Sequence, residues 1–153
     1  MKNIILAALV TLFISGCGDK KSSFILSSTS EQNLTETTKN LEKAIENENF
    51  TLVDTLDHKI TADEYNISIR PQKVIRFTHP QVASMLIACN TSMGMDVPFK
   101  MLVWNDYEGK THIEYMNPEY WSLTHNIKDK KCLALINQTK IAMDKAVDSI
   151  SAK

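Results

Sequence analysis

The chain has 153 residues, with 17 Lys and Arg against 18 Asp and Glu, and a formal net charge of −1. That length suits a single domain with one hydrophobic core. The near-neutral balance argues against a nucleic-acid-binding surface, so we expect no nucleic-acid partner. Only 4 Gly are present, and no glycine-rich phosphate loop, paired-carboxylate motif or serine elbow occurs.

The first residues have the pattern of a bacterial lipoprotein signal. One lysine precedes an apolar run over residues 4–14, and Ser15-Gly16-Cys17 follows this run. A basic start, a short apolar region and small residues before the cleavage point are what signal peptidase requires, and the run is too short to span a membrane stably. We predict a signal peptide over 1–16 and lipidation of Cys17. The alternative is a buried helix that ends in a core cysteine.

Acylation of Cys17 would attach the protein to the lipid bilayer, because several acyl chains anchor stably where one binds only marginally. Residues 17–23 are polar after the cysteine and contain no core-forming side chain, so we predict a short lipidated tether. Gly18 stands where an Asp would retain a lipoprotein in the inner membrane. The sequence therefore favours the cell envelope, at the outer membrane facing the periplasm if the cell is Gram-negative.

Two cysteines remain beyond the lipidation site, Cys89 and Cys132. An exported protein meets an oxidising compartment, so we predict one disulfide between them. The alternative is two unpaired buried thiols, since spacing alone does not show that the pair lies within bridging distance.

The elements expected in chain order begin with a β-prone run over 24–28. Leu34, Leu41, Ala44 and Ile45 recur at helical spacing and predict an amphipathic helix over 31–48. Alternating residues predict a strand over 50–56, a short helical or turn segment follows over 61–65, and a second such strand occupies 73–78.

The second half begins with a helix over 80–90, for which Pro80 suits the first position. A β-hairpin with strands at 99–104 and 111–116 is the clearest local signal, because Gly109 is placed for a positive-φ turn residue. A short helix over 118–123 and a C-terminal helix over 129–150 complete the chain. We therefore predict one α+β domain over 24–153: a small, mostly antiparallel sheet of about four strands, with helices on one face and a C-terminal helix.

Four motifs in order resemble the family catalogued as domain of unknown function 302. They cover residues 30–127 and are Leu56-Asp57-His58, the run from Arg70 to Pro80, the run from Asp96 to Trp104, and Tyr115-Met116-Asn117-Pro118 leading to His125. The resemblance implies a small α+β domain and a homodimer, with no reaction or ligand established for the class. The chain departs from the family in Thr78-His79 before Pro80, in its two cysteines and in its helix past residue 128.

Four side chains are candidates for ligand binding. Arg70 and Lys100 each stand next to a proline near a strand start and could present two positive charges to a small anion. Structural contacts of Arg70 with a backbone carbonyl, with Asp57 or with Asp96 are the alternative. His58 and His125 could bind a ligand or act as bases, although lone histidines in loops are more often hydrogen-bonded structural groups.

No other constellation points to chemistry. The histidines lack the spacing of a known ligand motif, so we expect no metal site, no cofactor and no catalytic residue, and the seven methionines fill core space. Trp104 and Trp121 are expected to pack in the core. We predict a membrane-tethered periplasmic domain that binds a small anionic ligand or an envelope protein without catalysis. The alternatives are a thiol-redox or metal-handling accessory protein and, less favoured, a hydrolase or isomerase.

Overall fold

The computed structural model describes residues 24–151. The predicted signal peptide over 1–16, the tether over 17–23 and the lipidated Cys17 lie outside this range. No helix within 24–151 is long and apolar enough to cross a membrane. The elements in chain order are β1 (Ile25–Ser30), α1 (Leu34–Asn47), β2 (Thr51–Asp57), α2 (His58–Glu64), β3 (Gln72–Thr78), α3 (Pro80–Cys89), η1 (Thr91–Met95), β4 (Phe99–Asn105), β5 (Thr111–Met116), η2 (Pro118–Tyr120), α4 (Trp121–Thr124) and α5 (Lys130–Asp148).

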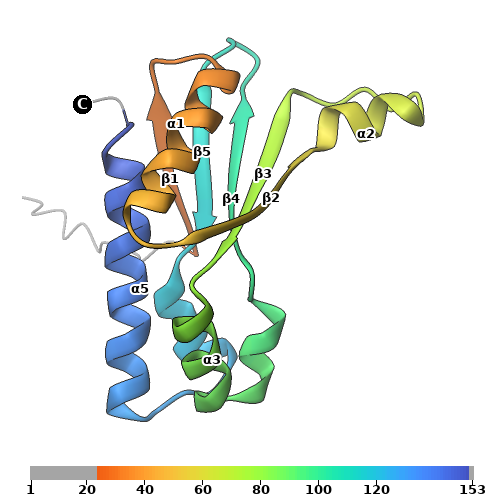
Figure 1. Ribbon diagram of the computed structural model, residues 1–153. Coiled ribbons are helices and arrows are strands. Elements are labelled where there is room, and N and C mark those ends of the chain that lie inside the picture. Colours follow the sequence, from red (N-terminus) through yellow and green to blue (C-terminus); the bar gives the residue numbers. More distant parts are fainter. Residues whose placement is uncertain (1–23, 152–153) are drawn as a thin grey trace, which may run out of the picture.

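The protein is α+β, as predicted, but its sheet has five strands rather than about four. The strand order is β1-β5-β4-β3-β2, and all neighbours are antiparallel (Figure 1). The additional strand is β1, which lies at one edge and pairs Ile25 with Met116 and Ser30 with Thr111. The β-prone run expected over 24–28 corresponds to β1, but its pairing with β5 joins segments far apart in the chain, and no local pattern shows that it joins the sheet.

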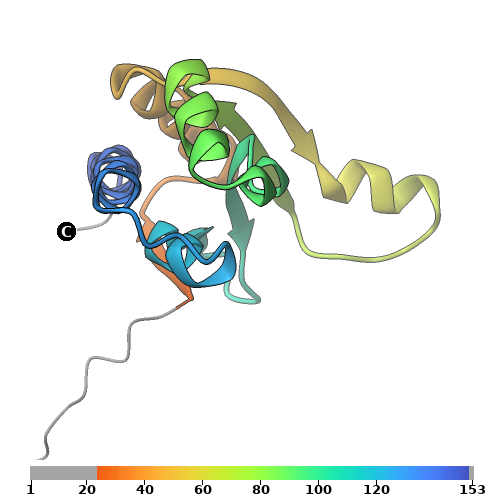
Figure 2. The same cartoon turned by 90° about the horizontal axis from the view of Figure 1, so that it is seen from below.

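The two faces of the sheet have different environments because side chains alternate along a strand. On β4, Phe99, Met101 and Val103 are buried, whereas Lys100 on the other face is exposed. The buried face packs against α1 and α5, which lie on the same side of the sheet in both views (Figures 1 and 2). The residues that fill this core are Leu41, Ala44, Ile45, Phe50, Ile75, Phe77, Phe99, Met101, Val103, Ile113, Tyr115, Ile136, Met143, Ala146 and Val147.

The predicted helices are present with ordinary caps. Asn33 caps α1 by accepting a hydrogen bond from the Glu36 backbone N–H at 3.0 Å. Pro80 occupies the first turn of α3, where its missing N–H costs nothing. The Asp129 carboxylate caps α5 by accepting from two backbone N–H groups of the first turn.

A projecting arm, residues 58–71, leads from β2 through α2 to β3. It extends away from the rest of the molecule in both views (Figures 1 and 2). No residue of α2 is buried. Ile60, Tyr65 and Ile67 are 61%, 72% and 57% exposed. The arm therefore presents apolar side chains to solvent without a core of its own.

Cys89 and Cys132 lie at disulfide distance, with their sulfur atoms 2.05 Å apart. Cys89 is the last residue of α3 and Cys132 lies in the first turn of α5. Both are partly buried against the core. The bond fastens α3 to α5 at the end of the molecule away from the β4–β5 turn (Figure 1).

Candidate functional site

The structure places Arg70 and Lys100 toward opposite ends of the open face of the sheet. Arg70 precedes β3 at the end where Gln72 pairs with Trp104, whereas Lys100 pairs with Arg76. Four residues separate these two register positions, which is about 13 Å along the strand. The two cations are therefore not brought together around one small anion.

His58 and Asp57 do not form a site with each other. His58 is exposed as the first residue of α2. The Asp57 carboxylate instead accepts from the backbone N–H of Lys59 at 3.0 Å and caps the helix. Its second oxygen lies 3.5 Å from Nζ of Lys73. Asp57 thus holds the base of the arm to β3.

His125 is buried, with 4% of its surface exposed. Its Nδ1 lies 2.6 Å from Oγ of Ser92, and its Nε2 lies 2.5 Å from Oδ2 of Asp96. These are the residue types of a serine-hydrolase triad. However, Ser92 Oγ also donates to Asn90 at 2.9 Å. Five surface cavities were compared, and none of them is lined by Ser92, Asp96 or His125. The cluster ties η1 to the end of α4.

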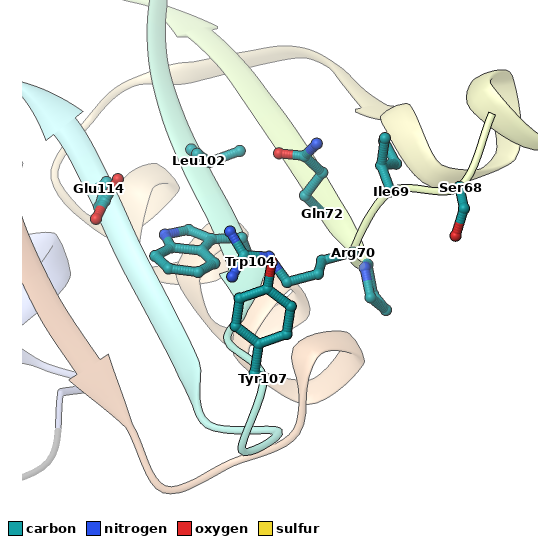
Figure 3. A pocket seen from close by; sticks show the side chains of 9 residues that line it. Ser68, Ile69, Arg70, Gln72, Leu102, Trp104, Tyr107 and Glu114 are labelled. Carbon is teal, nitrogen blue, oxygen red and sulfur yellow. The ribbon is translucent and has the colours of Figure 1, made fainter.

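The largest of these cavities lies on the open face, between the arm and the β4–β5 hairpin (Figure 3). Its volume is about 750 Å³. The guanidinium of Arg70 lies between two aromatic rings, with Cζ 4.9 Å from the centroid of Trp104 and 4.4 Å from that of Tyr107. Such contacts stabilise a cation and fix the plane of the guanidinium. The remaining lining comes from Ser68, Ile69, Pro71, Gln72, Leu102 and Glu114.

The β4–β5 turn positions the aromatic part of this cavity. The Asp106 Oδ1 atom accepts from the backbone N–H groups of Glu108 and Lys110, each at 2.9 Å. Gly109 has a φ of 82°, the left-handed conformation predicted for it. Tyr107 follows Asp106 directly and is carried over Arg70 by this turn. The hairpin signal in the sequence therefore also locates one wall of the site.

A second contact joins the turn to Trp104. The Asp106 Oδ2 atom lies 2.8 Å from Nε2 of His112, and the His112 ring stacks on Trp104 with centroids 4.6 Å apart. The hydrogen bond with His112, followed by those from the turn backbone, holds the pKa of Asp106 below its ordinary value. The carboxylate thus stays charged and keeps His112 beside the indole.

Two groups of the site have N–H donors that could bind a further acceptor. Nε1 of Trp104 is buried, and no acceptor lies within hydrogen-bond distance of it among the described residues. Within the same range, no carboxylate lies at ion-pair distance from Arg70. Arginine presents several N–H donors in a planar fork that matches an oxyanion. The arrangement can bind an anion beside an aromatic surface.

A second, apolar cavity of about 220 Å³ adjoins the first on the same face. Leu102 and Glu114 line both cavities. The rest of its lining is Ile25, Val74, Lys100, Tyr115 and Met116. Lys100 thus belongs to this second cavity and not to the surroundings of Arg70.

The packing predicted for the two tryptophans holds for one of them. Trp121 is in the core and stacks on Phe99 with centroids 5.2 Å apart. Trp104 lies on the open face, so the expectation was wrong for that residue. The alternation of side chains along β4 could have predicted this position. A strand that buries Phe99, Met101 and Val103 on one face places Trp104 on the opposite face, together with Lys100. Among the described residues, no group of three or more His, Cys, Asp or Glu side chains could hold a metal ion.

Fold and site together define a small antiparallel α+β domain with one covered face and one open face that carries Arg70 and Trp104. The pattern of the domain of unknown function DUF302 matches residues 26–150, and the chain belongs to this family. A crystal structure of an uncharacterised conserved DUF302 protein from Bacillus stearothermophilus has the same fold, with a TM-score of 0.77 and 18% identity. That match covers 84% of this chain and 99% of the other.

Curated relatives match a shorter part of the chain. Proteins named fluoride-specific ion channel FluC 1 from Brucella suis and Brucella abortus are each 28% identical over 72 residues. The matched segment is 47% of this chain but only 28% and 27% of those proteins. The chain thus spans little more than a quarter of their length.

Proposed function

We propose that the domain binds a small carboxylate-bearing ligand at the cavity between the arm and the β4–β5 hairpin, without catalysing a reaction. The observation that supports this most directly is Arg70. Its guanidinium is held between Trp104 and Tyr107 at a cavity of about 750 Å³ and has no carboxylate partner among the described residues. The two ring contacts favour one orientation of this exposed guanidinium, which lowers the reorganisation needed to accept an oxyanion.

The Trp104 indole supports the same proposal. A buried donor without an acceptor costs free energy, and a neutral acceptor atom of a ligand would remove that cost. In Figure 3 the indole nitrogen lies on the side of the ring toward Glu114, while Arg70 lies over the ring. A carboxylate at Arg70 can therefore be recognised by the guanidinium over the face of the ring, while the indole N–H on the Glu114 side is left for another part of the ligand. The pairing is planar on both sides, which favours carboxylate geometry.

We also propose that this domain is held in the cell envelope through acylated Cys17. The support is the sequence pattern of the first 17 residues, because the structure describes only residues 24–151. A tether of the length predicted for 17–23 would hold Phe24, where the described part of the domain begins, within about 25 Å of the anchored cysteine. Incorporation of labelled palmitate that is lost in Cys17→Ser would test the anchor.

The ligand proposal can be tested by NMR with butyrate as the probe. The two indole N–H resonances are assigned by comparison with Trp121→Phe, because Trp121 lies in the core and Trp104 at the cavity. Butyrate should shift the Trp104 resonance in a saturable way. Arg70→Gln should weaken this binding about tenfold or more, which is the range for a hydrogen bond to a charged group.

Lys100→Gln is the matched control, because it removes one cation from the same face without touching the Arg70 cavity. Its butyrate affinity should equal that of the wild type. Equal loss in both variants would show a general charge effect and overturn the site. Sodium fluoride is the second probe, in view of the name of the Brucella relatives. A Trp104 shift with fluoride and none with butyrate would show that the carboxylate class is wrong.

The thiol-redox alternative has less support from the geometry. Cys132 lies in the first turn of α5, but its backbone N–H and that of Lys131 already donate to Asp129. The nearby carboxylate opposes formation of a thiolate. The bond joins two helices that pack on the core. We therefore propose a structural role for the cysteines.

A further inference from the structure

We propose that the ligand of this site is a single-chain amphiphile of the fatty-acid class, with its carboxylate at Arg70 and its alkyl chain along the open face of the sheet. This inference rests on the proposed function and adds the chemical class of the ligand. The observation behind it is that a cavity of mixed polar and aromatic lining and an apolar cavity meet on one face. Leu102 and Glu114 line both.

The apolar half of this groove is built by three strands. Val74 of β3 lies opposite Leu102 of β4, which in turn lies opposite Glu114 of β5. Met116 and Ile25 follow on β5 and β1, where they are cross-strand partners. Met116 is 54% exposed and Ile25 is 49% exposed. Contiguous apolar groups left open on a sheet mark a binding surface.

The dimensions favour a long ligand rather than a compact one. The groove runs from the Trp104 position on β4 to the level of Lys100, which is four residues or about 13 Å along the strand. It also crosses from β4 to β1, two strand spacings of about 4.8 Å each. A compact anion at Arg70 would leave this apolar half empty.

The charged side chains along the groove determine which end of the ligand lies at Arg70. Glu114 stands where the cavities meet and would repel a carboxylate placed over the junction. At the far end, Lys100 is a flexible point charge whose aliphatic stem can cover the apolar surface. At the near end, Arg70 is fixed by two rings and offers a planar fork. The carboxylate of the ligand therefore lies at Arg70, and its alkyl chain points toward Met116.

A chain-length series tests this assignment with the Trp104 indole resonance as the readout. The probes are butyrate, hexanoate, octanoate, decanoate and dodecanoate, each below its micelle concentration. Each buried methylene should tighten binding by about fourfold. The gain should level off near dodecanoate, when the chain outruns the groove. Decyltrimethylammonium, which has the chain but the opposite charge, should not bind.

Two conservative variants test where the alkyl chain of the ligand lies. Val74→Thr and Met116→Gln keep the shape of side chains that line only the apolar cavity. Both should weaken decanoate severalfold and leave butyrate unchanged, so a fold defect would be recognised by its effect on butyrate. Arg70→Gln should weaken every member of the series by the same factor.

The outcomes separate the two proposals. Butyrate binding that depends on Arg70 but does not tighten with chain length would overturn the amphiphile and leave the carboxylate site standing. Chain-length dependence that is indifferent to Arg70 would overturn both. If a second copy of the chain covers the open face instead, decanoate affinity will fall as the protein concentration rises, and the amphiphile assignment fails.

Discussion

Asp106 and His112 form the contact that joins the β4–β5 turn to the candidate site. Their side chains meet at 2.8 Å, while the other oxygen of Asp106 holds two backbone N–H groups of the turn. His112 stacks on Trp104, and Tyr107 of the same turn lies over Arg70. One carboxylate thus positions both aromatic rings that contact the guanidinium.

Asp106→Asn should lower stability at neutral pH, and the difference from the wild type should vanish in acid. The pKa of Asp106 is lowered in the folded state, so its contribution is complete above the unfolded Asp pKa of about 3.9 and is lost as the pH falls through the lower folded value. Urea denaturation of both proteins between pH 6 and pH 2, a range of about four units around that value, would measure this. A difference that grows in acid would contradict the assignment.

Replacing both cysteines, Cys89→Ser with Cys132→Ser, should lower the free energy of unfolding by about 4 kcal/mol on the chain-entropy model. The sequence separation of 43 residues sets the size of the loop that the bond closes. Urea denaturation would measure the loss, and dithiothreitol on the wild type should reproduce it.

Ligand binding provides the control for the cysteine experiment. A structural bond predicts that butyrate still shifts the Trp104 resonance in the folded double variant. Loss of binding in a variant that remains folded would revive the thiol-redox alternative. Alkylation of the native, unreduced protein at either cysteine would show that the bond is not formed.

His125→Ala should lower the free energy of unfolding by about 1–3 kcal/mol, because it leaves the polar groups of Ser92 and Asp96 without their buried partner. Thermal melting would detect the change. Ser92→Ala is the companion variant. Hydrolysis of 4-nitrophenyl acetate that disappears in both variants would contradict a structural role and would promote the hydrolase alternative.

Local patterns in the sequence were sufficient for most elements of the fold. The hairpin around Gly109, the helix that begins at Pro80 and the C-terminal helix all follow from turn chemistry, capping and 3.6-residue spacing. The β-prone run over 24–28 was recognised, but it was not counted as a fifth strand of the sheet, because its place beside β5 depends on a pairing between distant segments. Contacts between distant segments have no signature in either segment alone.

For the same reason, the sequence predicted only part of the site. Arg70 could be singled out as a cation beside a proline, but its aromatic neighbours come from the end of β4 and from the turn after it, more than thirty positions later in the chain. The pairing of Gln72 with Trp104 brings them together, and register is a property of the assembled sheet. Lys100 has the same local character as Arg70, yet antiparallel pairing sends it toward the opposite end of the face.

The arm over residues 58–71 exposes apolar side chains to solvent. We propose that a second copy of the chain packs against it, which would give the homodimer that the family resemblance implies. A seven-residue helix is marginal in water without tertiary packing, and no residue of α2 is buried. Ile60 and Tyr65 instead expose most of their surface. A partner that covers them would supply the missing packing.

Ile60→Ser with Tyr65→Ser should shift the protein from dimer to monomer in sedimentation equilibrium, while the wild type remains dimeric. The matched control is Leu123→Ser, because Leu123 is 74% exposed on α4, away from the arm. This control should leave the dimer intact. Monomeric wild-type protein at all concentrations would contradict the proposal. Because both substitutions lie outside the lining of the Arg70 cavity, butyrate binding in the monomeric variant would also show that the ligand site is complete in one chain.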